Sequence, residues 1–310
     1  MLALKSVLFS ALIGTMSTIV SANRIAHHNG LSVHVYHLAP EPVLYQNSTD
    51  LSFSPTAFTL ISGHHSAVLV DAPATTGQGQ EIIEWIAKTI PGKSLKYIYV
   101  THGHGDHFFS AGVLQQKYPN AKVIATKGTA EHIAQQYTQP FFDSFWAALF
   151  PDKIDTKPIS VDVLPEDGIF KLEGHDFRAV SVGQGDTYNS TVLHVPSLDL
   201  VVGGDVVYGD CHQLFAEDNT PELRAKWLDS LDKVAALKPK VVVPSHMRED
   251  NAYSPDHVDE TKEYIRAYEQ FLKESKTWQE LEGKLKERFP DRDGTFILRW
   301  SCQAPFGADF

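Results

Sequence analysis

A short stretch of the sequence gathers imidazole and carboxylate side chains at a spacing that suits metal binding. It consists of His102, His104, Asp106 and His107, separated only by Gly103 and Gly105. Side chains of these types crowd onto one turn when a cation offsets their mutual repulsion. Imidazole and carboxylate donors without thiolate suit zinc best, although iron and manganese accept the same donors. The sequence therefore predicts a metal centre, with zinc as the preferred ion.

Each segment that carries candidate ligands follows a short apolar run typical of a buried strand. The run from Tyr97 to Thr101 precedes the cluster, and the run from Leu200 to Gly203 precedes Asp205. A third run, Val241 to Val243, leads to His246. We therefore expect strand ends to bring these side chains together.

The rest of the chain alternates between strand-like and helix-like patterns. Strands are predicted at 31–38, 58–71 with a hairpin break at Ser62-Gly63, 97–101, 123–126, 169–172, 177–182, 191–195, 200–203 and 241–243. Helices are predicted at 80–90, 112–118, 129–137, 221–237, 256–273 and 277–288. Strands followed by alternation, twice over, predict an α/β (α+β) fold in which two packed sheets have helices outside.

An aromatic stretch, 141–150, interrupts this alternation. Its rings belong to Phe141, Phe142, Phe145, Trp146 and Phe150. One interpretation is a helix that packs on the core, and the other is an apolar wall or lid over the site.

Length and composition are those of a folded globular protein. The chain has 310 residues, 43% of them hydrophobic, and a formal net charge of −11 without a basic run. Nucleic acid is excluded as an expected partner, because phosphate contacts need clustered cations. Cys211 and Cys302 lie too far apart in sequence for a CxxC motif, and the sequence leaves open whether they pair.

The first residues have the features of a secretory signal peptide. Lys5 precedes a weakly apolar stretch, and Val20-Ser21-Ala22 offers small residues for cleavage. We therefore predict a signal peptide at 1–22, a single domain at 23–310, and a secreted protein that makes no membrane contact once the signal is removed.

The order of these motifs resembles the metallo-β-lactamase superfamily, whose hallmark is an HxHxDH pattern. The resemblance rests on the cluster at 102–107, on Asp71 at the end of an early strand, on Gly203-Gly204-Asp205, and on Pro244-Ser245-His246. It implies an αββα sandwich of two mixed sheets, with metals bound at one edge where the two halves meet.

The resemblance also implies two adjacent metal sites. His102 and His104 would hold the first ion together with a third histidine, but Gln184 stands at that histidine's place. A glutamine oxygen is a weaker ligand, so the first site should bind zinc less tightly unless Asp186 reaches it. The second site would use Asp106, His107 and His246, with Asp205 bridging both ions. One firmly bound zinc and a second, conditional one are expected, and Asp71 would orient the ligand turn.

Such a centre predicts hydrolysis of a small acyl substrate, a lactam, lactone or thioester, by attack of metal-bound hydroxide. Asp106 would orient the water or relay its proton. Tyr208 would contact the substrate carbonyl, because its spacing from Asp205 is similar to that in the superfamily's acyl-homoserine lactonases. No motif chooses among these substrates. The alternative is a degenerate member that binds a ligand without turnover, because Gln184 has disabled the first site.

Overall fold

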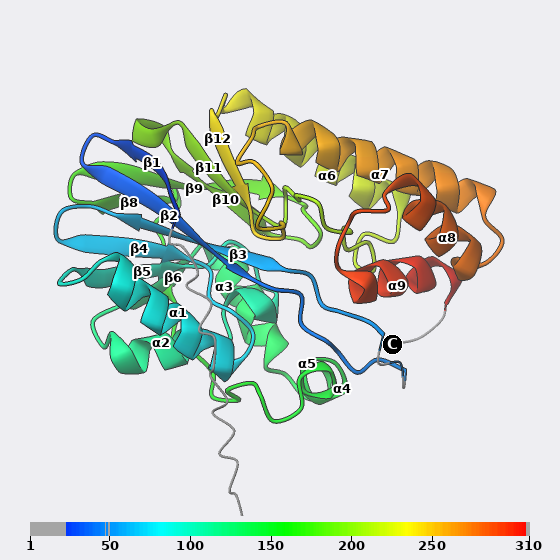
Figure 1. The fold of residues 1–310 in the computed structure, drawn as a ribbon, viewed down its shortest axis with the longest axis horizontal. Helices are drawn as coiled ribbons and strands as arrows, with labels where there is room; N and C mark the ends of the chain where they lie inside the picture. Colours follow the sequence, from blue (N-terminus) through cyan, green and yellow to red (C-terminus); the bar gives the residue numbers. More distant parts are fainter. Residues whose placement is uncertain (1–22, 47, 49, 308–310) are drawn as a thin grey trace, which may run out of the picture.

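The computed structural model describes residues 23–46, 48 and 50–307. Within these residues the chain forms two stacked β-sheets with helices on the outside of each (Figure 1). This arrangement confirms the αββα sandwich predicted from the sequence. The predicted signal peptide lies outside the described residues.

The first sheet contains the strands of the N-terminal half in sequence order. They are β1 (Asn23–His28), β2 (Leu31–Leu38), β3 (Thr56–Ser62), β4 (Ser66–Val70), β5 (Ser94–Tyr99), β6 (Lys122–Ala125) and β7 (Asp162–Val163). Strands β1 to β4 pair antiparallel, whereas β4 to β7 pair parallel. Parallel neighbours need crossover connections, and helices supply those between β4 and β6.

The second sheet has the order β12-β11-β10-β9-β8. Its strands are β8 (Ile169–Leu172), β9 (His175–Gly183), β10 (Ser190–Val195), β11 (Leu200–Gly204) and β12 (Val241–Pro244). The pairs from β8 to β11 are antiparallel and β11 pairs with β12 in parallel, across the long helix α6 (Pro221–Ala236).

Helices cover the outer faces of both sheets. In sequence order the remaining ones are α1 (Thr76–Thr89), α2 (Ala111–Lys117), α3 (Lys127–Gln136), α4 (Phe141–Ser144), α5 (Trp146–Leu149), α7 (His257–Glu274), α8 (Trp278–Arg288) and α9 (Thr295–Gln303). Figure 1 shows α1 and α2 outside the first sheet and α6 and α7 outside the second. No helix among the residues that the structure describes is long and apolar enough to cross a membrane.

Alternation along the strands produces a core on each face. In β2, Leu31, Val33 and Val35 pack between the two sheets, whereas Tyr36 and Leu38 pack under the helices. A further core lies between the second sheet and its helices and includes Cys211 and Cys302, which are buried free thiols. The period-two pattern therefore fixes which side of each strand faces the partner sheet.

Most predicted elements are present within a few residues of their expected ends. The strands β1 and β7 and the helix α9 were not predicted. The stretch 141–150 forms two short helices, α4 and α5, rather than one. Helix α9 is short, and its buried residues include the polar Ser301 and Gln303, so its buried face was not recognised in the sequence.

A carboxylate locks the turn between β3 and β4. Glu173 accepts hydrogen bonds from the backbone N–H groups of His64, His65 and Ser66 at 2.7–2.8 Å and from the Ser66 hydroxyl at 2.9 Å. Desolvation alone would raise the pKa of Glu173, but these donors lower it to about 2. The turn thus holds the β8–β9 connection of the second sheet against the first.

We expect Glu173→Gln to destabilise the protein by about 1 kcal/mol at neutral pH, a small effect because solvent screens this exposed carboxylate. The lowered pKa contributes stability that is present above the ordinary pKa of a glutamate and is lost as the pH falls toward 2. Urea unfolding from pH 7 to pH 2 should therefore show the difference between wild type and variant shrinking below about pH 4.5. A difference that persists unchanged at pH 2 would contradict this role.

Candidate metal centre

The candidate site lies where several strands end at one edge of the sandwich. Asp71 follows β4, the cluster at 102–107 follows β5, and His246 follows β12. Asp186 and Asp205 follow β9 and β11, which run in the same direction because each pairs antiparallel with β10. The loops at these carboxyl ends converge, as expected from the sequence.

The ligand turn is tightly packed against its surroundings. After β5 the chain enters a single 3₁₀ turn, Gly105–His107, in which all residues are buried. A Cβ at Gly103 would overlap the imidazole of His132, and one at Gly105 would overlap the ring of Phe109. Glycine at these two spacers therefore lets the turn pack against α3 and its own following residues.

Each of the four histidines is held at one ring nitrogen by a protein oxygen. His102 Nδ1 lies 3.0 Å from Thr101 Oγ1, and His104 Nε2 lies 3.1 Å from Glu217 Oε1. His107 Nδ1 lies 3.0 Å from Asp71 Oδ2, and His246 Nδ1 lies 3.1 Å from the carbonyl oxygen of Pro55. Because these oxygens can accept a proton from one ring nitrogen, the opposite nitrogen of each ring is the one that would bind a metal ion.

Asp71 organises this arrangement from a buried position. Its carboxylate accepts from the backbone N–H and the hydroxyl of Thr101, from His107 and from Ser245, at 2.8–3.2 Å. The backbone of this residue has a φ of 62°, in the left-handed region that residues other than glycine rarely adopt. It therefore fixes the ligand turn and the β12 loop together, in the orienting role expected for it.

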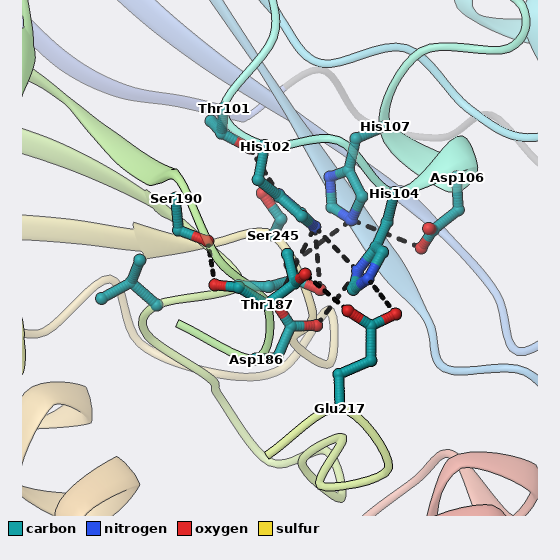
Figure 2. A network of polar contacts seen from close by, with 12 residues as sticks. Thr101, His102, His104, Asp106, His107, Asp186, Thr187, Ser190, Glu217 and Ser245 are labelled. Atoms are coloured by element: carbon teal, nitrogen blue, oxygen red, sulfur yellow. Dashed lines mark hydrogen bonds and ion pairs between the residues drawn. The ribbon is translucent and has the colours of Figure 1, made fainter. Parts of the chain in front are cut away.

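The opposite nitrogens of the histidine rings face three buried aspartates. His102 Nε2 and His104 Nδ1 lie 4.0 and 3.3 Å from carboxylate oxygens of Asp186. His246 Nε2 lies 3.3 Å from Asp106 and 3.1 Å from Asp205. Figure 2 shows His102, His104 and His107 on one side and Asp186 and Glu217 on the other, with their polar atoms pointing toward one another.

Several of these atoms lack hydrogen-bond partners among the described residues. They are His107 Nε2, Asp186 Oδ1 and Asp205 Oδ1, all buried. Buried polar atoms without partners are costly, so their convergence at one point calls for a cation. Three groups among the described residues have the spacing of metal ligands: His102, His104, Asp186 and Asp205; Asp106, His107 and His246; and His104, His132 and Glu217, which shares His104 with the first. Asp205 also lies 3.4 Å from His107 Nε2, so its carboxylate faces both of the first two groups.

Near the position expected for a third histidine, the side chains of Gln184 and Asp186 point in different directions. The side-chain nitrogen of Gln184 donates to Asp218 Oδ1 at 2.9 Å, whereas Asp186 lies among the histidines. A turn closed by the Gly185 N–H and the Thr187 carbonyl accounts for the two directions. The contacts thus favour Asp186 over Gln184, which the sequence placed at the ligand position.

The electrostatics of the site reflect its crowded carboxylates. Burial raises the pKa of Asp186 to about 7 and that of Asp218 to about 8. Burial acts in the same direction on Glu217, but His104 outweighs it and lowers the pKa to about 2. The Tyr208 hydroxyl donates to Asp186 and Asp205 at 3.2 Å, and burial raises its pKa well above the ordinary value, so it stays protonated.

A pocket opens beside the clustered ligands. Its polar floor includes His104, Asp106, Asp186, Asp205, Tyr208, Glu217 and His246, and its walls include Phe53, Phe141, Phe145, Trp146, Leu214, Ile297 and Trp300. Both interpretations of the stretch 141–150 therefore hold, because Trp146 packs in the core and also lines the pocket. Glu217 and the wall residues outside that stretch were not predicted, since no local motif marks them.

Comparison with known proteins is consistent with this geometry. Residues 51–246 match the family described as the metallo-beta-lactamase superfamily. The chain is 22% identical over 216 residues to a type 2 metallo-beta-lactamase of Bacteroides fragilis, covering 69% of this chain and 76% of the relative. It is 24% identical over 204 residues to a UPF0173 metal-dependent hydrolase of Pyrococcus abyssi, covering 62% and 80%.

Solved structures show the same fold. A metallo-beta-lactamase from Pontibacter korlensis superposes with a TM-score of 0.56 at 18% identity, covering 79% of this chain and 98% of that one. The mono-zinc form of FIM-1 from Pseudomonas aeruginosa superposes with a TM-score of 0.53 at 17% identity, covering 79% and 94%.

Proposed function

The chain belongs to the metallo-β-lactamase superfamily, and from this premise we propose that it is a zinc-dependent hydrolase of small acyl substrates. The substrate class is a lactam, lactone or thioester whose acyl carbon is attacked by water. A metal-dependent hydrolase agrees with the relatives, one of which is itself described by that activity.

One observation carries it: two groups of buried ligands face each other across the Asp205 carboxylate. Each histidine has one nitrogen held by a protein oxygen, so the opposite nitrogen is the one that would bind a metal ion. Four imidazoles and three carboxylates suit zinc, and we assign Asp186 to the position of the third histidine. A divalent metal ion bound here lowers the pKa of water and polarises a carbonyl group.

The chain's own groups then determine how a substrate is handled. Asp106 lines the pocket, where its carboxylate can orient the attacking water and accept its proton. Tyr208 keeps its hydroxyl proton and lies beside Asp186 and Asp205; with these carboxylates engaged by a metal ion, that one proton could instead be donated to a developing oxyanion. The aromatic wall excludes water from the apolar part of the substrate.

Metal content and turnover, measured together, test the proposal. We expect protein purified without chelators and dialysed against a defined zinc buffer to hold between one and two zinc ions per chain by elemental mass spectrometry. The same preparation should hydrolyse at least one member of a panel of lactones, lactams and thioesters, and chelation should abolish this activity, with zinc restoring it. Retained zinc without turnover of any panel member would instead support the degenerate ligand-binding alternative.

A further inference from the structure

We propose that this site selects substrates that are uncharged and apolar beside the scissile bond, and that it discriminates against anionic ones. The inference rests on the proposed function and narrows its substrate class. It is carried by the composition of the pocket wall, by the carboxylates on its floor, and by the absence of Lys and Arg among the described residues that line it.

The wall is almost entirely hydrocarbon. In this aromatic cluster, the ring of Trp146 lies next to those of Phe53 and Phe145. Phe141 stacks on Phe145, with 5.5 Å between the two ring centroids. The indole N–H of Trp146 donates to the side chain of Gln136, which also lines the pocket, at 2.8 Å. A substrate that reaches this wall therefore meets apolar surface and gains from its burial.

The polar floor is rich in carboxylates. Asp106, Asp186, Asp205 and Glu217 all line the pocket, and no Lys or Arg does so among the residues described. We assign Asp186 to the position of the third histidine. Its carboxylate gives the centre one more negative charge than a neutral histidine would. The ligand carboxylates offset most of the charge of two divalent ions, and Glu217 adds a further negative charge at 3.1 Å from His104.

An anionic group on the substrate is therefore disfavoured at the wall and gains little at the floor. Against the wall it would lose its hydration without gaining a partner, and at the floor the four carboxylates offset the charge of two divalent ions. An uncharged aryl or alkyl group has no such desolvation cost at the wall. The wall thus differs from an anion-binding surface, which needs a fixed cation or a set of backbone N–H donors.

Matched substrates test this inference. An aryl lactone and an aryl thioester would each be made in two versions, with a carboxamide or an isosteric carboxylate on the ring far from the acyl carbon. We expect wild-type kcat/KM for the carboxamide to exceed that for the carboxylate by at least about tenfold, the scale of one unfavourable charge contact. Equal values, or a preference for the carboxylate, would overturn the inference while leaving the hydrolase intact.

A cation placed at the mouth of the pocket gives a second readout. Phe141 is 37% exposed, so Phe141→Lys adds a charge without emptying the core, and Phe141→Gln is its neutral control. We expect Phe141→Lys to reduce the carboxamide preference at least threefold relative to Phe141→Gln, with thermal melting confirming that both are folded. If the zinc-loaded chain hydrolyses neither version of either substrate, the proposed function itself fails and the inference falls with it.

Discussion

Asp205→Asn is expected to lower kcat/KM by at least about 10³-fold and to reduce the zinc content to one ion per chain or less. The reason is the position of this carboxylate, which lies 3.1 Å from His246 Nε2, 3.4 Å from His107 Nε2 and 3.8 Å from His102 Nε2. An amide keeps the shape but removes the charge that both ions would share. Elemental analysis and kinetics on the same preparation measure the two effects together.

Asp199→Asn provides the matched control. Asp199 pairs with Lys240 at the surface at 2.7 Å, and its φ of 50° is one that asparagine accepts. We expect this variant to keep the zinc content and activity of the wild type, because an exposed ion pair contributes little. If Asp205→Asn also retained two ions and wild-type activity, the shared-carboxylate centre would be refuted.

The second large effect is a difference between alanine substitutions at Asp186 and at Gln184. Asp186→Ala should lose the ion of the first site and about 10²-fold or more in kcat/KM, because its carboxylate is the group that faces His102 and His104. Gln184→Ala should keep both ions and lose less than about tenfold, since its side chain is bonded to Asp218 instead.

Zinc stoichiometry under identical dialysis distinguishes these two variants, with melting temperatures to show that each is folded. Gln184→Ala removes a donor from buried Asp218, so a modest loss of stability is expected for that variant alone. The opposite pattern, in which Gln184→Ala loses an ion and Asp186→Ala keeps both, would return Gln184 to the ligand position predicted from the motif.

Much of the fold was predictable because its signals are local. The apolar alternation in Leu31–Leu38 and the helical spacing in Pro221–Ala236 each report which face is buried, and both elements were expected within a residue of their observed ends. Helix α9 shows the limit of this reasoning. Its buried residues include the polar Ser301 and Gln303 beside Phe296, so the buried face does not stand out as apolar in the sequence.

The sequence by itself determined that this protein has a metal-binding turn. His102, His104, Asp106 and His107 are neighbours in the chain, so their convergence needs only one strand to end before them. The strand ends before Asp205 and His246 extended that prediction to a complete centre, since aligned strands end at a common edge.

Only the tertiary structure decided which neighbours complete the site. Pro55 and Glu217 orient histidines that lie more than a hundred residues away in the sequence, and no local pattern connects them. The choice between Gln184 and Asp186 depends on how one turn directs two side chains, which packing against Asp218 and the histidines determines. The pocket wall likewise joins α4 and α5 to α9, because burial of apolar surface brings distant segments together regardless of their separation along the chain.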